Sequence, residues 1–271
     1  MKDIRLLALD LDGTLTNSQK HVSDKNKVFI QRAQKKGIQV ILASGRPVIG
    51  MIGIAEELSL WNMGGYILAY NGGHIIDCKT GKDLVKHTVP MQYVHDICEV
   101  VRKFNVYPLT YNDIGVICEN EADRYVHLEG YNNSIPIIKV KRLETEITTP
   151  AVKFMVVGDP DELQKAYRYL KRLFKGNLNV FFSEPYFMEI TPLGIQKASA
   201  LAQLSEILGI KRDQIMACGD GLNDIPMLEY AGLAVAMDNA YPETKKAADY
   251  IVASNEEDGV AEAIERFILE G

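Results

Sequence analysis

Two stretches of this 271-residue chain, one at each end, alternate short apolar runs with segments of helical periodicity. Near the N-terminus the apolar runs are Leu6–Leu9, Ile38–Ala43 and Tyr66–Tyr70, and helices are predicted at Asp24–Lys36 and from Pro47 to about Leu60. Strands that alternate with helices are typical of parallel sheets, because each parallel connection needs a crossover. The sequence therefore predicts an α/β domain with a Rossmann-like parallel sheet.

The same alternation resumes in the last quarter of the chain. The predicted helices are Lys197–Leu208, Leu222–Tyr230, Tyr241–Ala248 and Asp258–Leu269, and the predicted strands are Gln214–Cys218, Leu233–Met237 and Tyr250–Val252. Because both ends show one pattern, we expect residues 1–81 and 194–271 to form a single α/β domain.

The middle of the chain, residues 82–193, has a different pattern. The apolar runs Tyr107–Tyr111 and Ile114–Cys118 are two residues apart, which favours an antiparallel hairpin. Amphipathic helices are predicted at Met91–Phe104 and Pro160–Phe174. We therefore expect an α+β domain inserted into the α/β domain. Its other predicted strands are Leu84–Val89, Ala151–Val157, Leu178–Phe182 and Phe187–Ile190.

Polar residues follow the predicted strands of the α/β domain. In an open parallel sheet, ligands bind beyond the carboxyl ends of the strands, so we expect these side chains to share one rim. Lys197 begins a helix after the insert and can reach the same rim. The residues that follow the strands are Asp10, Asp12, Ser44, Gly45, Arg46, Asn71, Asp220, Asn223 and Asp224.

These residue types suggest phosphate chemistry. Asp10, Asp12 and Asp220 would repel one another without a cation, and oxygen ligands suit Mg²⁺. Ser44 and Lys197 can bind phosphate oxygens, and glycines let backbone N–H groups approach an anion. A carboxylate held against a phosphate can act as a nucleophile, while a second carboxylate does acid–base work. We therefore predict that Asp10 attacks and that Asp12 is the general acid/base.

Four motifs, with an insert between the second and the third, resemble those of the haloacid dehalogenase (HAD) superfamily of phosphohydrolases. The similarity is greatest to its Cof-type, sugar-phosphatase-like branch, and it covers nearly the whole chain. The motifs are DLDGT at 10–14, LASGRP around Ser44, GIQKASAL around Lys197 and GDGLNDIPML around Asp220. AMDNA at 236–240 and ADYIVASNEEDGVA at 248–261 resemble the tail of this branch.

The resemblance implies a phosphoric monoester hydrolase that works through an aspartyl-phosphate on Asp10, with Asp12 as general acid/base. It implies that Mg²⁺ is held by the Asp10 side chain, the Asp12 backbone carbonyl and Asp220, and that Asn223 or Asp224 supports this shell.

The resemblance also implies how the substrate is held. Ser44, Gly45 and Lys197 would bind the phosphoryl group, and Arg46 and Asn71 would line the rim. The insert would be a mobile cap that closes over the substrate and determines its choice. The implied substrates are small phosphorylated metabolites, above all sugar phosphates.

Two positions depart from the family pattern. Ala198 stands where many relatives have glycine after the motif lysine, and Asp238 stands where the branch often reads A-M-G-N-A. Neither residue belongs to the predicted chemistry, so the departures leave the reaction class unchanged and the fine substrate preference open.

Composition excludes several other classes. A net charge of −6 and a pI near 5.5 argue against general binding to nucleic acid or anionic membranes. The chain has no phosphate loop of the G-x-x-x-x-G-K-[ST] type and no complete G-x-G-x-x-G. Four cysteines without close spacing suggest neither a zinc site nor disulfides. The short apolar run after MKDIR is not typical of a signal peptide or a membrane span, so we expect a cytoplasmic protein. The oligomeric state stays open.

Most of the selected residues also have a purely structural interpretation. Ser44 could cap a helix, Asn71-Gly72 could be a turn, and Arg46 could pair with a surface carboxylate. Glu189 is interpreted as a solvated strand residue, and the five histidines as structural or surface residues. Ser254–Asp258 is predicted to cap the final helix.

Two other functions remain open from the sequence. A phosphomutase of the same superfamily would return the phosphoryl group to its substrate and would yield an isomer in place of free phosphate. A non-catalytic sensor would bind a sugar phosphate without turnover. Its ligands would stabilise it against heat, but no phosphate would be released.

Overall fold

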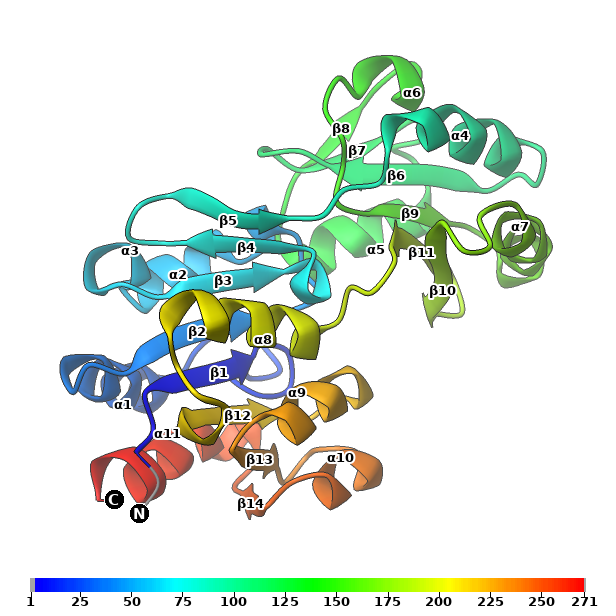
Figure 1. Cartoon of the computed structure of the whole chain (residues 1–271). Coiled ribbons are helices and arrows are strands. Elements are labelled where there is room, and N and C mark those ends of the chain that lie inside the picture. The colour runs from blue at the N-terminus through cyan, green and yellow to red at the C-terminus, as the bar shows by residue number, and fades with distance from the viewer. Residues whose placement is uncertain (1–2, 271) are drawn as a thin grey trace. The chain divides into compact units, whose positions relative to one another are not determined.

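Figure 1 shows the chain as a computed structural model that describes residues 3–270. The chain forms two compact units. The core unit comprises the described residues up to Gly45, Met51–Val85 and the described residues from Gln196 onward, and the insert unit comprises Arg46–Gly50 and Lys86–Ile195. The chain thus passes between the units after Gly45, Gly50, Val85 and Ile195.

A single sheet with the order β14-β13-β12-β1-β2-β3-β4-β5 forms the centre of the core unit (Figure 1). From β14 to β3 all neighbours are parallel, and β4 is antiparallel to β3. The predicted α/β class is therefore confirmed. The strands are β1 (Leu6–Asp10), β2 (Gln39–Ala43), β3 (Tyr66–Ala69), β4 (His74–Asp77), β5 (Lys82–Lys86), β12 (Ile215–Gly219), β13 (Leu233–Met237) and β14 (Tyr250–Val252).

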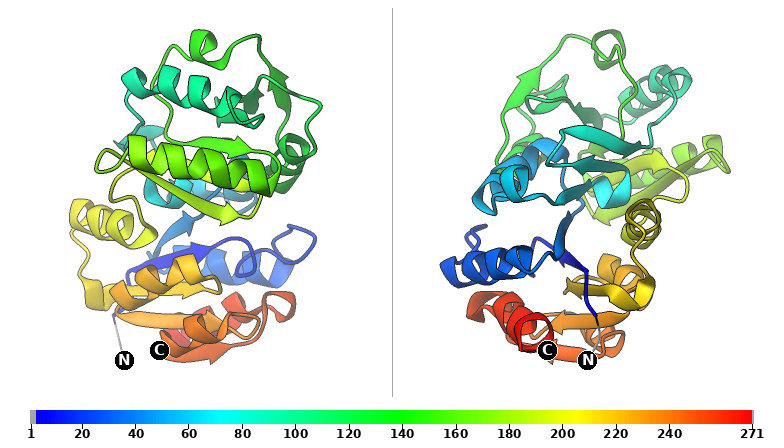
Figure 2. Two further views of the ribbon diagram at one scale, coloured as in Figure 1. Left: turned by 90° about the vertical axis from the view of Figure 1, so that its right-hand side faces the viewer. Right: turned by 60° about the vertical axis from the view of Figure 1, so that its left-hand side comes forward.

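Helices cover both faces of this sheet. Figure 2 shows α8 and α9 on one side and α1 with α11 on the other. Buried Leu201 and Leu204 of α8 pack against apolar strand residues of the first face. The helices are α1 (Asp24–Lys35), α2 (Ile52–Glu57), α3 (Leu60–Met63), α8 (Lys197–Leu208), α9 (Ile225–Tyr230), α10 (Pro242–Lys246) and α11 (Gly259–Ile264), and a π-helical turn at Glu265–Leu269 follows α11.

The insert unit is built on a second sheet with the order β10-β11-β9-β6-β7-β8. All of its strand pairs are antiparallel except β7 with β8. Helices α4 and α7 pack on one face through an apolar cluster that includes Ile97 and Leu163. The strands are β6 (Tyr107–Tyr111), β7 (Val116–Cys118), β8 (Ile137–Lys139), β9 (Phe154–Val157), β10 (Leu178–Glu184) and β11 (Phe187–Pro192), and the helices are α4 (Val94–Arg102), α5 (Arg124–Asn133), α6 (Leu143–Glu146) and α7 (Pro160–Leu173).

The helix predicted from Pro47 to about Leu60 is broken in the structure. A 3₁₀ turn at Val48–Gly50 comes first, and α2 and α3 follow as separate short helices. Ser59 separates α2 from α3 because it lies in the left-handed region, at φ 56°, where a helix cannot continue. The prediction of one continuous helix was therefore wrong.

The final helix begins directly after the segment Ser254–Asp258. Asp258 precedes α11 at φ 63°, and its side chain makes no capping hydrogen bond. Its carboxylate instead accepts a hydrogen bond from the hydroxyl of Ser23, at 2.5 Å. Asp258 occupies the N-cap position of α11, and the carbonyl of Ser254 accepts from the N–H of Gly259 at 3.1 Å, so Ser254–Asp258 caps the helix through its backbone and not through the Asp258 side chain.

All four cysteines are buried as free thiols. Burial raises the pKa of the Cys78, Cys98 and Cys218 thiols to about 12, so they stay protonated and unreactive near neutral pH. No helix formed by residues 3–270 combines the length and apolar character that a membrane span requires.

Candidate active site

Asp10 is the last residue of β1, and a tight loop follows it. The carbonyl oxygen of Leu11 accepts hydrogen bonds from the backbone N–H groups of Leu15 and Thr16, at 3.0 and 2.9 Å, and from the Thr16 hydroxyl, at 3.0 Å. Most hydrogen bonds of the loop thus end on one acceptor, and Asp10 itself is only 6% exposed.

Gly13 brings this loop against Asp220, which follows β12. Its φ of +84° favours glycine, and a Cβ at this position would lie 2.3 Å from Oδ2 of Asp220. The hydroxyl of Thr14 donates a hydrogen bond to Oδ1 of Asp220, at 2.7 Å. The first and fourth motifs are therefore joined directly.

Lys197, of the third motif, contacts carboxylates of the first and fourth motifs. Its ammonium group is fully buried and donates to Oδ1 of Asp10 at 2.5 Å and to Oδ1 of Asp224 at 2.6 Å. The other oxygen of Asp224 accepts from the backbone N–H groups of Asp220 and Gly221, at 3.1 and 2.9 Å. Asp224 is thus oriented by its own loop and by Lys197 together.

Burial dominates the electrostatics of this cluster. It raises the pKa of Asp10 well above the ordinary value, and the charge of Asp224 adds to the effect, while Lys197 opposes it. Burial also raises the pKa of Asp220, although the Thr14 hydrogen bond opposes that shift. For Lys197 burial works in the other direction, but Asp10 and Asp224 outweigh it and raise the pKa of the ammonium. The lysine therefore stays charged.

The donor set fits a hard divalent cation. Carboxylate oxygens of Asp10, Asp220 and Asp224 all lie within 4.8 Å of one another. With Lys197 charged and all three carboxylates ionised, two negative charges remain, which a divalent cation would balance. Oxygen ligands without histidine or cysteine suit Mg²⁺. The sequence predicts a supporting role for Asp224, but the structure places it within the acidic cluster itself.

The carboxylate of Asp12 lies in a different environment. It is 37% exposed, and its Oδ1 accepts a hydrogen bond from the ammonium of Lys20, at 2.6 Å. Lys20 belongs to a turn that begins at Asn17, whose Oδ1 accepts from the N–H groups of Gln19 and His21. Lys20 is not among the residues predicted from the sequence, because a lysine in a polar turn has no pattern that indicates a site.

The second motif and Asn71 are neighbours across β2 and β3. The N–H of Asn71 donates to the carbonyl of Ser44 at 2.9 Å, and a Cβ on Gly45 would lie 3.2 Å from Nδ2 of Asn71. Asn223 donates to Oδ1 of Asn71 at 3.3 Å. Ser44 does not cap a helix, since α2 begins only at Ile52. The structure brings these four predicted residues together.

Arg46 and Glu189, which were both considered from the sequence, lie in the insert unit. Arg46 is buried, and its Nη1 donates to the carbonyl of Gly50 at 3.3 Å; its place at the rim stays a prediction. Glu189 is also buried, 3.4 Å from the ammonium of Lys153. The expectation that Glu189 is solvated was wrong, because Lys153 supplies a buried opposite charge.

The two departures from the family pattern lie beside this site in the chain. Ala198 is the second residue of α8 and is half-buried. Asp238 is exposed after β13, and its Oδ1 lies 3.0 Å from the ammonium of Lys245. Neither side chain belongs to the acidic cluster.

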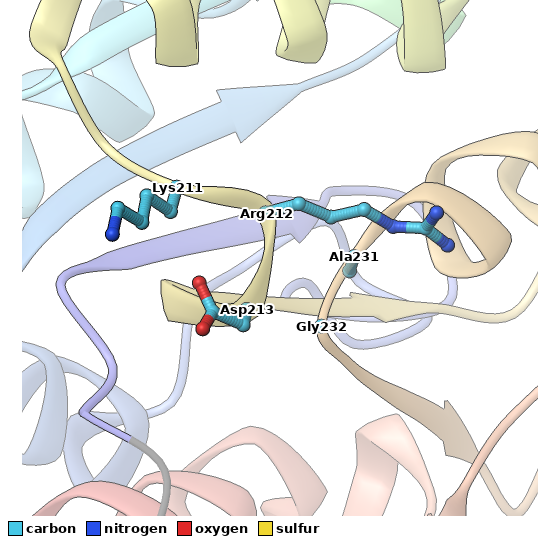
Figure 3. Close-up of a pocket in the computed structure, with 5 residues that line it drawn as sticks. All are labelled: Lys211, Arg212, Asp213, Ala231 and Gly232. Atoms are coloured by element: carbon cyan, nitrogen blue, oxygen red, sulfur yellow. The ribbon is translucent and has the colours of Figure 1, made fainter.

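A surface cavity of about 510 Å³ lies elsewhere on the core unit (Figure 3). Its lining residues precede β12 and β13, at the amino ends of these strands, whereas the acidic cluster lies at carboxyl ends. Arg212 donates from this cavity to the carbonyls of Glu229 and Tyr230 and thereby satisfies the end of α9. This accounts for Arg212 without a ligand. The cavity is lined by Lys211, Arg212, Asp213, Ala231 and Gly232.

Comparison with known proteins agrees with the motifs. A family model described as haloacid dehalogenase-like hydrolase matches residues 7–264. The chain is 34% identical to the 5-amino-6-(5-phospho-D-ribitylamino)uracil phosphatase YcsE of Bacillus subtilis, over 98% of this chain and 97% of that protein. Its fold matches the crystal structure of a haloacid dehalogenase-like hydrolase from Bacteroides thetaiotaomicron with a TM-score of 0.95 and 43% identity, covering 98% and 100% of the two chains. It also matches TM0651 from Thermotoga maritima with a TM-score of 0.89 and 28% identity, covering 97% of each chain. The resemblance is confirmed: the chain belongs to the haloacid dehalogenase-like hydrolases and is a phosphoric monoester hydrolase of that family.

Proposed function

We propose that this protein is a Mg²⁺-dependent phosphatase that hydrolyses small phosphorylated metabolites through an aspartyl-phosphate on Asp10. The observation that carries the proposal is the buried contact of Asp10 with Lys197, which Asp220 and Asp224 surround. Such a site concentrates opposite charges at the end of a strand, where a phosphate and its cation can enter between them.

Asp10 is the proposed nucleophile. One of its carboxylate oxygens attacks phosphorus, the bond from phosphorus to the substrate oxygen breaks, and the alcohol leaves with a proton. In the second step water attacks the same phosphorus, and the acyl-phosphate bond breaks to release phosphate and restore the carboxylate. Lys197 supports this role because its hydrogen bond to Oδ1 orients the carboxylate and offsets its charge.

Asp12 is the proposed general acid/base. Its carboxylate is partly exposed and follows Asp10 by two residues, so it can exchange protons with solvent and with a leaving oxygen. It donates a proton to the departing alcohol and then accepts one from the attacking water. The ion pair with Lys20 restrains its side chain before the substrate arrives.

The remaining residues hold the phosphoryl group and the cation. We assign phosphate binding to Ser44, Gly45 and Lys197, because a hydroxyl, a backbone N–H and an ammonium are all donors to phosphate oxygens. Asp10, Asp220 and the backbone carbonyl of Asp12 would hold Mg²⁺. When bound, Mg²⁺ would neutralise part of the phosphate charge.

Asp224 and Asn223 would support the cation ligands. Asp224 does so through the hydrogen bonds that it accepts from the backbone N–H groups of Asp220 and Gly221. Asn223 would do so from the loop that follows Asp220, where its side chain donates to Asn71. We further propose Asn71 and Arg46 as residues of the rim.

Sugar phosphates and polyol phosphates are the proposed substrates. The B. subtilis relative is named for a substrate whose phosphate is carried on a ribityl chain, a linear polyol. We therefore extend the proposal to phosphate esters of short polyhydroxylated chains. The insert unit is proposed to determine the choice among them.

Phosphate release from a panel of sugar and polyol phosphates tests the proposal, in Mg²⁺ and in chelator. Asp10→Asn keeps the shape of the side chain and removes the nucleophile. Asp213→Asn makes the same chemical change at an exposed residue at the opposite end of β12. We expect Mg²⁺-dependent release by the wild type and by Asp213→Asn, and no measurable turnover by Asp10→Asn. Release that survives in Asp10→Asn would contradict the proposed nucleophile.

A further inference from the structure

The two tail segments, 236–240 and 248–261, contact the loop that follows Asp10. Nδ2 of Asn239 donates to the carbonyl of Gly13 at 2.7 Å, and Nδ2 of Asn255 donates to the carbonyl of Thr16 at 2.9 Å. The two asparagines are also joined, because the N–H of Asn255 donates to Oδ1 of Asn239 at 3.0 Å. We call Asn239 and Asn255 the asparagine bridge.

Two residues after this loop, Ser18 and Ser23, also form hydrogen bonds with the segment 248–261. The N–H of Ser18 donates to Oε1 of Glu256 at 2.7 Å, and the hydroxyl of Ser23 donates to Asp258 at 2.5 Å. The excursion from Gly13 to Ser23 therefore has four anchors on a segment more than two hundred residues away in the sequence.

The asparagine bridge supplies hydrogen-bond donors to two backbone carbonyls of the loop. Most internal hydrogen bonds of residues 14–16 end on the carbonyl of Leu11, and the N–H of Leu15 also donates to the carbonyl of Asp10 at 3.3 Å. The carbonyls of Gly13 and Thr16 are not part of this internal set. They accept from the side chains of Asn239 and Asn255. A neutral amide suits this arrangement because Asn239 both donates to Gly13 and accepts from Asn255, which a carboxylate or an alkyl side chain cannot do.

The peptide that Asn239 holds joins Gly13 to Thr14 and lies next to residues of the proposed site in the chain. Asp12 precedes Gly13, and Thr14, which follows it, donates to Asp220. A rotation of the Gly13 carbonyl would turn the N–H of Thr14 with it and would disturb the hydrogen bond from the Thr14 hydroxyl to Asp220.

We propose that Asn239 and Asn255 are positioning residues for the reaction, which hold the loop from Asp12 to Thr16 in register with Asp220. This inference rests on the proposed function of Asp10 and Asp12. It assigns a role in catalysis to the two tail segments, neither of which carries a reacting group. Misplacement of a reacting group by about 1 Å costs on the order of 100-fold in rate, so the loss of one anchor has a measurable effect.

The test compares Asn239→Leu and Asn255→Leu with the wild type, by steady-state kinetics and by amide hydrogen exchange. Leucine is close to asparagine in size and has no polar atoms. We expect kcat to fall about 10-fold or more in each variant, with KM changed by less than about 3-fold. We expect the double variant to lose less than the product of the single losses, because the two residues act through one bridge.

Amide exchange supplies the readout that does not depend on turnover. We expect faster exchange at residues 11–23 in both variants and unchanged exchange in α8. Asn239→Ala and Asn255→Ala serve in the same way if either leucine variant fails to fold. Asn62→Leu, at an exposed position of α3, is the control and should match the wild type.

The outcomes separate this inference from the proposed function. Unchanged kcat in an active enzyme, or unchanged exchange at residues 11–23, overturns the asparagine bridge and leaves the phosphatase proposal intact. Faster exchange throughout the core unit also overturns it, because the residues would then be merely structural. A wild type that turns over no member of the panel overturns the proposed function, and exchange at residues 11–23 then still decides whether the bridge holds the loop.

Discussion

Lys197 is the residue on which the charge balance of the site depends. Its ammonium contacts two buried carboxylates, and it is fully buried itself. A buried ion pair contributes little net stability compared with a well-packed apolar replacement of the whole pair, but removal of one partner is costly. The cost arises because the other charges keep their desolvation penalty and lose their compensation.

Lys197→Met should therefore destabilise the protein. We expect the free energy of unfolding, measured with urea in the absence of added metal, to fall by about 3–5 kcal/mol. Lys20→Met removes the exposed ion pair with Asp12 and is the control, with an expected loss below about 1 kcal/mol. Equal losses in the two variants would show that burial of Lys197 does not govern its contribution.

Gly13→Ala should abolish activity with a modest effect on folding. The new Cβ would lie 2.3 Å from Oδ2 of Asp220, so the loop or the carboxylate must move. Gly37 has nearly the same φ, +88°, but a Cβ on Gly37 would have nothing within 4 Å. Gly37→Ala thus shares the backbone strain, about 1 kcal/mol, without the clash. Phosphate release should be lost in Gly13→Ala alone; its retention there would contradict the close contact of Gly13 with Asp220.

For single residues, the sequence predicted those that belong to a motif. Asp10, Ser44, Lys197 and Asp220 each follow or begin a regular element, so their neighbourhood could be inferred. The pairing of Asp12 with Lys20 could not be inferred in this way, because it depends on the path of an irregular turn. The burial of Glu189 was equally hidden, since its partner Lys153 is distant in the sequence.

Among the elements, a cluster around Arg102 joins three separate parts of the insert unit. Arg102, the last residue of α4, donates to Glu119, just after β7, and to Glu144 in α6, each at 2.5 Å. The side chain of Glu144 is 12% exposed, and the hydrogen bonds from Arg102 lower its pKa to about 2. The cluster therefore links stability to pH.

The sign of that link follows from the lowered pKa. In the unfolded chain Glu144 titrates near 4.5, so its contribution is present above that pH and is lost as the pH falls toward 2. The contribution is about 3 kcal/mol at most. We expect Glu144→Gln to be less stable than the wild type at pH 7, and the two to converge between pH 4.5 and 2 in urea unfolding. A constant difference over that range would contradict the lowered pKa.

The elements of the two sheets were predicted unequally. Runs such as Leu233–Met237 matched the strands because they are apolar, short and bounded by polar turns. β4 was missed and β5 was assigned to the insert. Both are short strands at the edge of the sheet, where β4 pairs with β3 and β5 lies next to β4, and this pairing is set by tertiary contacts. The strand β8 was missed because it has only three residues, and helix α5 was missed because Arg124–Asn133 has no clear apolar stripe.

For the whole molecule, the two units have separate apolar cores. One cluster contains Phe154 with residues of α4 and α7, and another contains Leu204 with residues of β1 and β12. The two clusters have no residue in common. Each of these two clusters therefore lies within a single unit.

Core truncation should therefore act within one unit at a time. We expect Phe154→Ala to cost about 3–5 kcal/mol and Leu204→Ala about 2–5 kcal/mol, because each leaves a cavity in a fully buried cluster. Amide exchange should quicken in the insert unit for Phe154→Ala and in the core unit for Leu204→Ala. Phe181→Ala and Ile207→Ala remove exposed side chains of β10 and α8 and are the matched controls, with little expected effect. Exchange that quickens equally in both units for either variant would show that the chain unfolds as a single cooperative body and that the separation of the two cores has no energetic consequence.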